Sequence, residues 1–176
     1  MTIGGFDGFL LEALRHEDAQ ALRGMHPGDL AMSRGEWLYP HGGEEAFIAA
    51  ALAGEVDGRE LRAAIWQDGQ LIGIIGLKQD GAGSASISYA LDARYRGQGI
   101  MTGACGVLIA HGFRTLRLER FEIIADPGNQ PSCAIAQRLG FAREGVLKDL
   151  YRSSDGLHDG IQYVLRASEW AAGLSS

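Results

Sequence analysis

Three short apolar runs follow one another in the middle of the chain and limit the possible folds more than any other feature. They are ELRAAIW (60–66), QLIGIIGL (70–77) and SASISYAL (84–91), and short segments containing Asp and Gly separate them. The pair Asp68-Gly69 is a strong signal for a tight hairpin turn. Consecutive strands joined by such short turns predict an antiparallel meander.

Helices and further strands are predicted on both sides of this meander. The predicted elements are, in order, a strand at 9–14, helices at 16–25 and 43–56, the three strands of the meander, a helix at 100–111, a strand at 120–126, a short helix that ends at Gly140, and a closing hairpin of strands at 142–153 and 161–167. No internal repeat or linker divides the chain. We therefore expect one mixed α/β (α+β) domain over residues 1–176, with helices on both faces of a largely antiparallel sheet.

Charge and hydropathy exclude several classes of protein. The net charge is −6, whereas a nucleic-acid-binding protein usually has a basic excess, so DNA is not expected as a partner. No apolar run approaches the roughly 20 residues that span a membrane, and the N-terminus lacks the basic region of a secretory signal. We expect a cytoplasmic protein. Cys105 and Cys133 form no Cys-x-x-Cys pair, which favours buried, reduced thiols and no metal site.

The segment RYRGQG lies between the last strand of the meander and a predicted helix. The first N–H groups of a helix lack backbone partners and carry a partial positive charge, and glycine lets a ligand approach the backbone closely. Gly97 and Gly99 therefore predict a phosphate site, to which Arg94, Arg96 and the hydroxyl of Thr102 add donors. A glycine-rich turn with two solvated arginines is the simpler alternative. A dinucleotide-binding motif is disfavoured because the segment follows a meander, and a P-loop because no Gly-Lys-Ser/Thr follows.

A second motif begins thirty residues later. The segment NQPSCAIAQRLGF (129–141), together with RYRGQG, resembles the GCN5-related N-acetyltransferase (GNAT) superfamily. A closer resemblance is to the branch that acetylates N-terminal amines of ribosomal proteins, and it is carried by the segments LDARYRGQGIMT, EGVL and HDGIQYVL. This resemblance covers about residues 71–170. This resemblance implies the GNAT fold, with a mostly antiparallel seven-stranded sheet that is splayed between its fourth and fifth strands and flanked by about four helices. It also implies acetyl-coenzyme A as the acetyl donor.

The resemblance also implies where acetyl-coenzyme A lies. Its pantetheine arm is expected to run beside the strand 84–91, near Tyr89 and Leu91, with the acetyl group between that strand and 120–126. Asn129 is expected to help hold the arm. The backbone amides expected to bind the pyrophosphate are those of Arg96, Gly97, Gln98 and Gly99.

Direct transfer to an amine needs a group near the leaving sulfur, a donor to the oxyanion and a way to remove the amine proton. The resemblance places Ser132 beside the sulfur, although a serine there can also simply bond to the helix backbone. Many members carry Tyr one turn later, where this chain has Ala136. A backbone N–H near residues 89–91 is expected to bind the oxyanion.

The proton acceptor has several candidates. Many members of the ribosomal branch have Glu where this chain has Tyr151, and a phenol with an ordinary pKa near 10 is a poor base. Tyr151 acting through water, Glu122 on the strand 120–126, or selection of an already neutral amine are the alternatives. Tyr151 could also do no more than line the acceptor groove. A hydrogen-bonded turn is favoured over a catalytic pair for His158 and Asp159.

The acceptor is expected to be a protein or peptide N-terminus or a small amine such as an antibiotic, a polyamine or an aminoacyl compound. A coenzyme-A-binding module with little catalysis is the third hypothesis. Trp37, Leu38 and Tyr39 are expected to belong to the core or to shape the acceptor site. Both a monomer and a homodimer remain open.

Overall fold

The fold is a single open sheet with helices on both faces. A computed structural model describes residues 1–26, 43–153 and 156–173, so Trp37, Leu38 and Tyr39 lie outside the described residues. The strands in the described part of the chain are β1 (Thr2–Phe6), β2 (Phe9–Ala13), β3 (Glu60–Gln67), β4 (Gln70–Gln79), β5 (Ser84–Leu91), β6 (Arg120–Ala125), β7 (Ala142–Ser153) and β8 (Gly156–Arg166). The helices are α1 (Ala19–Arg23), α2 (Glu44–Val56), α3 (Ile100–Arg114), α4 (Gln130–Arg138) and α5 (Ala167–Gly173).

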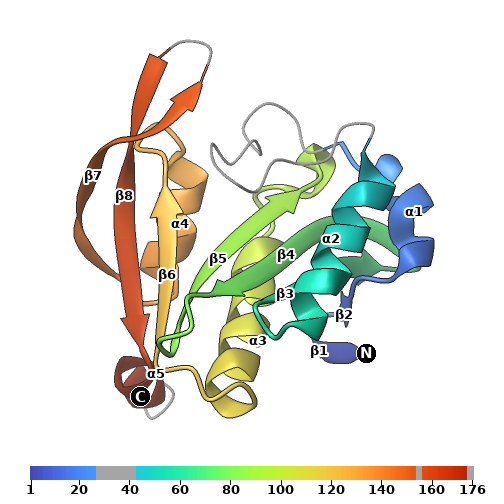
Figure 1. Ribbon diagram of the computed structural model, residues 1–176, viewed down its shortest axis with the longest axis horizontal. Helices are drawn as coiled ribbons and strands as arrows, with labels where there is room; N and C mark the ends of the chain where they lie inside the picture. The colour runs from blue at the N-terminus through green and yellow to red at the C-terminus, as the bar shows by residue number, and fades with distance from the viewer. Residues whose placement is uncertain (27–42, 154–155, 174–176) are drawn as a thin grey trace.

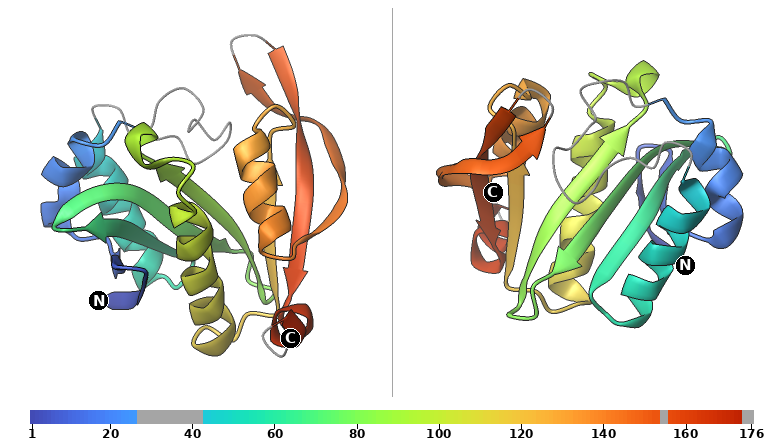
Figure 2. Two further views of the ribbon diagram at one scale, coloured as in Figure 1. Left: turned by 180° about the vertical axis from the view of Figure 1, so that it is seen from behind. Right: turned by 45° about the horizontal axis from the view of Figure 1, so that its top comes forward.

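The eight described strands lie in the order β1-β2-β3-β4-β5-β6-β8-β7. Every neighbouring pair is antiparallel except β5 and β6. The helices α1 and α2 cover one face of the sheet, and α3 and α4 cover the other (Figures 1 and 2). The predicted meander is confirmed as β3-β4-β5, and the predicted mixed α/β class is confirmed with it.

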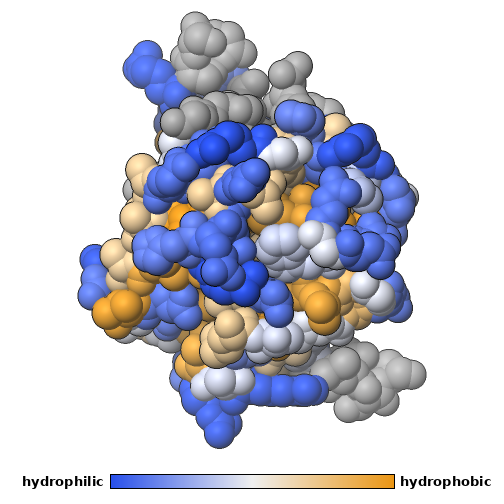
Figure 3. All heavy atoms as spheres, turned by 90° about the vertical axis from the view of Figure 1, so that its right-hand side faces the viewer, coloured by the Kyte–Doolittle hydropathy of each residue, from blue (hydrophilic) through white to orange (hydrophobic). Residues whose placement is uncertain are grey.

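Alternation along the central strands builds a core on each face of the sheet. On β3, Ile65 packs in the core with Leu108 of α3, whereas the adjacent Ala64 packs with Leu22 of α1 and Ile48 of α2. This period of two is what a strand buried on both faces requires. On the outer side of the N-terminal half, hydrophilic side chains predominate and apolar ones are scattered among them (Figure 3). The apolar residues of this half therefore serve mainly the two cores.

The sheet opens between β5 and β6. These strands pair in parallel only from Ser84↔Arg120 to Ser86↔Glu122, and beyond this point they diverge (Figure 1). β5 remains paired with β4 as far as Leu91, so from residue 87 onwards its other edge has no strand partner among the described residues. The expected splay between the fourth and fifth predicted strands is confirmed.

The described chain has one strand more than the seven expected. The additional strand, β1, forms a hairpin with β2 through Asp7 and Gly8, both of which have positive φ. This Asp-Gly pair is the same turn signal as at residues 68–69, but the glycine-containing TIGGF before it lacks a clear strand pattern. β8 begins at Gly156, so most of the turn predicted at 154–160 is strand, and α5 was not predicted. None of the helices in the described ranges is long and apolar enough to cross a membrane.

Candidate active site

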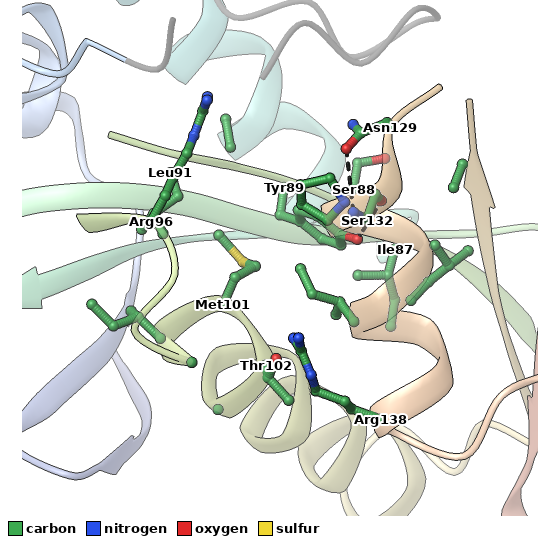
Figure 4. Close-up of a pocket in the computed structure, with 18 of the residues that line it drawn as sticks. Ile87, Ser88, Tyr89, Leu91, Arg96, Met101, Thr102, Asn129, Ser132 and Arg138 are labelled. Carbon is green, nitrogen blue, oxygen red and sulfur yellow. Dashed lines mark hydrogen bonds between the residues drawn. The ribbon is translucent and has the colours of Figure 1, made fainter. Parts of the chain in front are cut away.

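A cavity of about 690 Å³ lies where β5 and β6 diverge. Its walls come from the second half of β5, the start of α3, the end of β6 and one face of α4 (Figure 4). Tyr151 of β7 also lines it. The cavity therefore joins the two motifs recognised in the sequence, which are separated by about thirty residues of chain.

The start of α3 faces this cavity with backbone donors. Gly99 is the N-cap residue and has a φ of 78°, and Gly97 has a φ of 74°. No side chain of the described residues caps this helix end. The first backbone bond of the helix is donated by Gly103 to Gly99, so the N–H groups of residues 100–102 precede it. No atom outside the adjacent residues lies within 4 Å of the Cβ position of either glycine, which leaves space for an anion in front of these donors.

Four of the residues expected around the phosphate line the cavity. They are Arg96, Gly97, Gly99 and Thr102. Gln98 does not line it, and its side-chain Nε2 lies 3.5 Å from the carbonyl oxygen of Arg94. The local sequence thus places the predicted glycines, one predicted arginine and the predicted hydroxyl on one wall.

The expectation that Arg94 adds a phosphate donor is not what the structure shows. Arg94 does not line the cavity, and its guanidinium donates to the buried carboxylate of Asp92 through Nε at 2.9 Å and Nη2 at 2.8 Å. Asp92 also accepts from the backbone N–H groups of His26 and Arg94, each at 3.0 Å. The Arg94 guanidinium, followed by these N–H groups, holds the pKa of Asp92 well below its usual range. Arg94 therefore fixes the loop that leads into α3.

Two hydroxyls meet on the opposite wall. Ser132 Oγ lies 2.6 Å from Tyr89 Oη, which comes from β5 (Figure 4). Asn129 is the N-cap residue of α4 and accepts the N–H of Ser132 at 3.2 Å through Oδ1. All three predicted residues line the cavity, as does Leu91. The hydroxyl of Ser132 thus meets a phenol, and the simpler role of a helix-start hydroxyl bonded to the backbone is not the contact observed.

Burial governs the ionisation of Tyr89. Desolvation raises the pKa of its phenol well above the ordinary value, and the hydrogen bond with Ser132 opposes this only in part. The phenol therefore keeps its hydrogen at neutral pH and remains able to donate.

The two candidate proton acceptors lie in different places. Tyr151 lines the cavity, but Glu122 does not. The carboxylate of Glu122 accepts from the side chains of Arg120 and Gln162 and lines a separate depression next to Lys78. Glu122 lies where β6 still pairs in parallel with β5, opposite Ser86, whereas β6 lines the cavity from Ile123 to Ala125, where the two strands diverge. The structure does not support Glu122 as the base.

A histidine and a carboxylate that the sequence did not pair lie beside Tyr151. The Tyr151 ring stacks on His158 with centroids 6.4 Å apart, and His158 Nδ1 lies 4.0 Å from Asp126 Oδ2. Asp126 lines the cavity. The turn predicted for His158 and Asp159 is wrong because both belong to β8, and Asp159 binds Lys148 Nζ at 2.7 Å. The contact between His158 and Asp126 joins β8 to the end of β6, which no local spacing could reveal.

Arg138 is a site residue that the sequence analysis did not single out. It lines the cavity from α4 and extends toward α3 near Thr102 (Figure 4). Ser132, Ile135 and Arg138 all line the cavity. Their spacing of three residues places them on one face of a helix, so helical periodicity counted from Ser132 would have identified Arg138.

Known proteins share both the sequence and the fold of this chain. Residues 9–142 match the family model described as an acetyltransferase (GNAT) domain. YdaF of Bacillus subtilis strain 168, provisionally named a ribosomal N-acetyltransferase, is 37% identical over 112 residues, which are 62% of this chain and 61% of YdaF. The ribosomal-protein-serine acetyltransferase of Escherichia coli strain K12 is 35% identical over 97 residues, 54% of each chain. The chain thus spans between about half and two thirds of the lengths of these curated relatives.

Solved structures match over nearly the whole chain. The crystal structure of a protein named as a probable acetyltransferase has a TM-score of 0.85 and 27% identity, and the match covers 97% of this chain and 99% of the other. RimL, a ribosomal L7/L12 α-N-protein acetyltransferase in complex with coenzyme A, has a TM-score of 0.86 and 22% identity, and the match covers 96% of this chain and 99% of RimL. The second likeness establishes the fold alone. Since the family model covers most of the residues, and the fold agrees with it, this chain belongs to the GNAT acetyltransferase domain family.

Proposed function

We propose that the protein transfers the acetyl group of acetyl-coenzyme A to a primary amine by direct attack. The observation that carries this proposal is the continuity of the cavity, which runs from the uncapped start of α3 to the hydroxyl of Ser132. A diphosphate fits the backbone donors of α3, and the unpaired edge of β5 fits an extended arm that bonds to backbone groups. Membership of the GNAT family supports acetyl-coenzyme A as the donor.

In this proposal acetyl-coenzyme A supplies an activated thioester, and the chain supplies positions for it. The amides at residues 96–102, Arg96 and Arg138 hold its phosphates. The hydroxyl of Ser132 stabilises the departing sulfur, and a backbone N–H near residues 89–91 stabilises the oxyanion. Tyr151 and Asp126 face the cavity where an amine would lose its proton. No covalent enzyme intermediate is needed.

A protein or peptide α-amine is the acceptor that we favour. The relatives named above support it, since one is a ribosomal-protein-serine acetyltransferase and another is provisionally assigned to the same kind of acceptor. A small polyamine is the second candidate, because the spermidine N(1)-acetyltransferase of Escherichia coli K12 is 29% identical over 93 residues. The cytoplasmic location predicted from the sequence is part of this proposal.

Mass spectrometry of competing acceptors tests the proposal. The purified protein and acetyl-coenzyme A are incubated with a peptide that has a free N-terminal serine or alanine, the same peptide with a blocked N-terminus and an internal lysine, and spermidine. We expect one acetyl group on the free α-amine and none on the blocked peptide. Acetylation of spermidine alone would favour the second candidate, and no product with any acceptor would contradict transfer.

A further inference from the structure

The hydrogen bond between Tyr89 and Ser132 sets where the hydroxyl hydrogen of Ser132 can point. The two oxygens are 2.6 Å apart, and either could be the donor. Each hydroxyl carries one hydrogen. If Ser132 donates to Tyr89, its hydrogen is committed to the phenol. If Tyr89 donates, the hydrogen of Ser132 is left for a group in the cavity.

The surroundings favour Tyr89 as the donor. Its side chain is half-buried, desolvation raises the pKa of the phenol and so keeps it protonated, and the structure gives its oxygen Ser132 as a partner. The backbone of Ser132 is fixed separately, because its N–H is bound by Asn129 at the start of α4. Ala136, one turn along α4, is fully buried and has no hydroxyl that could take over either role. Only the direction of the Ser132 hydrogen is therefore left to be set.

We propose that Tyr89 is a positioning residue that donates to Ser132 Oγ and so directs the Ser132 hydrogen toward the sulfur that leaves. This inference rests on the proposed acetyl transfer. In that step the amine nitrogen bonds to the carbonyl carbon and the carbon–sulfur bond breaks. The sulfur keeps the electron pair and leaves as a thiolate that accepts the Ser132 O–H, while the proton of the amine passes to solvent. In this step the side chain of Tyr89 acts through the hydroxyl of Ser132.

A double-mutant cycle tests this coupling. Ser132→Ala is expected to lower kcat about 100-fold, within the range for loss of a group that stabilises the transition state. Tyr89→Phe in the otherwise unchanged protein is expected to lower kcat about tenfold, the effect of one hydrogen bond, with KM for acetyl-coenzyme A little changed. In the Ser132→Ala background, Tyr89→Phe should have no further effect on kcat, since no hydroxyl remains to be directed.

Tyr163→Phe is the matched control. Tyr163 is buried in β8 but does not line the cavity, so losing its hydroxyl should leave kcat unchanged. Binding of coenzyme A by calorimetry and the circular dichroism spectrum confirm that each variant is folded.

Two results would overturn the inference while leaving acetyl transfer intact. One is an unchanged kcat for Tyr89→Phe, and the other is an equal loss with and without Ser132, which would show that the phenol acts by packing. A wild-type protein that binds coenzyme A but acetylates no amine would overturn the proposed function, and this inference with it.

Discussion

At the α3 end of the cavity the polar groups belong largely to the backbone, whereas at the β7–β8 end they belong to side chains. The first group consists of N–H donors presented by Gly97, Gly99 and the first turn of α3. The second consists of Tyr151 and Asp126, with His158 behind them. Backbone N–H groups bind a feature that all cosubstrates of one class share, such as a diphosphate. Side chains can change from protein to protein, and this is the end at which we place the acceptor.

The largest expected effect is at the backbone end. Gly99→Val places a branched side chain at a φ of 78° and in the space in front of the helix donors. Each charge-assisted hydrogen bond contributes about 1.5–3 kcal/mol, so the loss of two should weaken acetyl-coenzyme A binding by about 100-fold or more. Calorimetric titration measures this change.

Gly69→Val is the control for backbone strain. Gly69 lies in the β3–β4 turn with a φ of 77° and has the same open space around it, but it is not among the residues that line the cavity. It should lose stability without losing affinity. Equal affinity for wild type and Gly99→Val would refute the role assigned to the start of α3.

Arg138 tests whether a side chain also contributes at the phosphate end. Arg138→Gln removes an exposed charge that lines the cavity, and we expect acetyl-coenzyme A to bind about tenfold more weakly at low salt. Because salt screens exposed charges, the difference should narrow at high ionic strength. Titrations at two salt concentrations measure it, and an unchanged affinity at low salt would show that Arg138 makes no phosphate contact.

Arg94 should affect folding rather than binding. Arg94→Gln leaves the buried Asp92 with fewer donors, so we expect a lower Tm at pH 7 and a nearly unchanged affinity for acetyl-coenzyme A. The folded-state pKa of Asp92 is depressed, so its stabilising contribution is fully present above the ordinary value of about 3.9 and is lost as the pH falls further. The difference in Tm should therefore narrow in acid. A large loss of affinity for acetyl-coenzyme A with no change in Tm would show that Arg94 contributes to phosphate binding and would contradict the structural role.

The smallest effect is expected at the side-chain end. Tyr151→Phe removes one hydroxyl from the region assigned to the acceptor, and water can replace it in a proton relay. We expect kcat to fall about threefold, the lower range for one hydrogen bond. Steady-state kinetics measure kcat for Tyr151→Phe, with Tyr163→Phe as the control variant. A loss as large as that of Ser132→Ala would give the phenol an essential part in the reaction.

The same difference between the two ends explains what could be predicted from sequence. The conformations of Gly97 and Gly99 depend on the local sequence, so the open, uncapped start of α3 could be predicted before the fold was known. The meander was predictable for the same reason, since Asp68-Gly69 specifies its own turn. β1 was missed although Asp7 and Gly8 carry the same signal, because its strand residues include two glycines.

Contacts between distant segments could not be predicted. The pairing of His158 with Asp126 depends on the register of β8 against β6, and the exclusion of Glu122 from the cavity depends on where β6 separates from β5. Arg94 was expected at the phosphate because charge complementarity is visible in sequence, whereas the burial of Asp92 is not. The hydrogen bond between Tyr89 and Ser132 likewise joins residues that are 43 positions apart.

A crystal structure of the protein with coenzyme A tests the central claim most directly. We predict that the diphosphate oxygens accept hydrogen bonds from the backbone N–H groups at the start of α3, and that the sulfur lies between β5 and β6 within contact of Ser132 Oγ. A diphosphate bound elsewhere, with no ligand atom at the start of α3, would contradict the account.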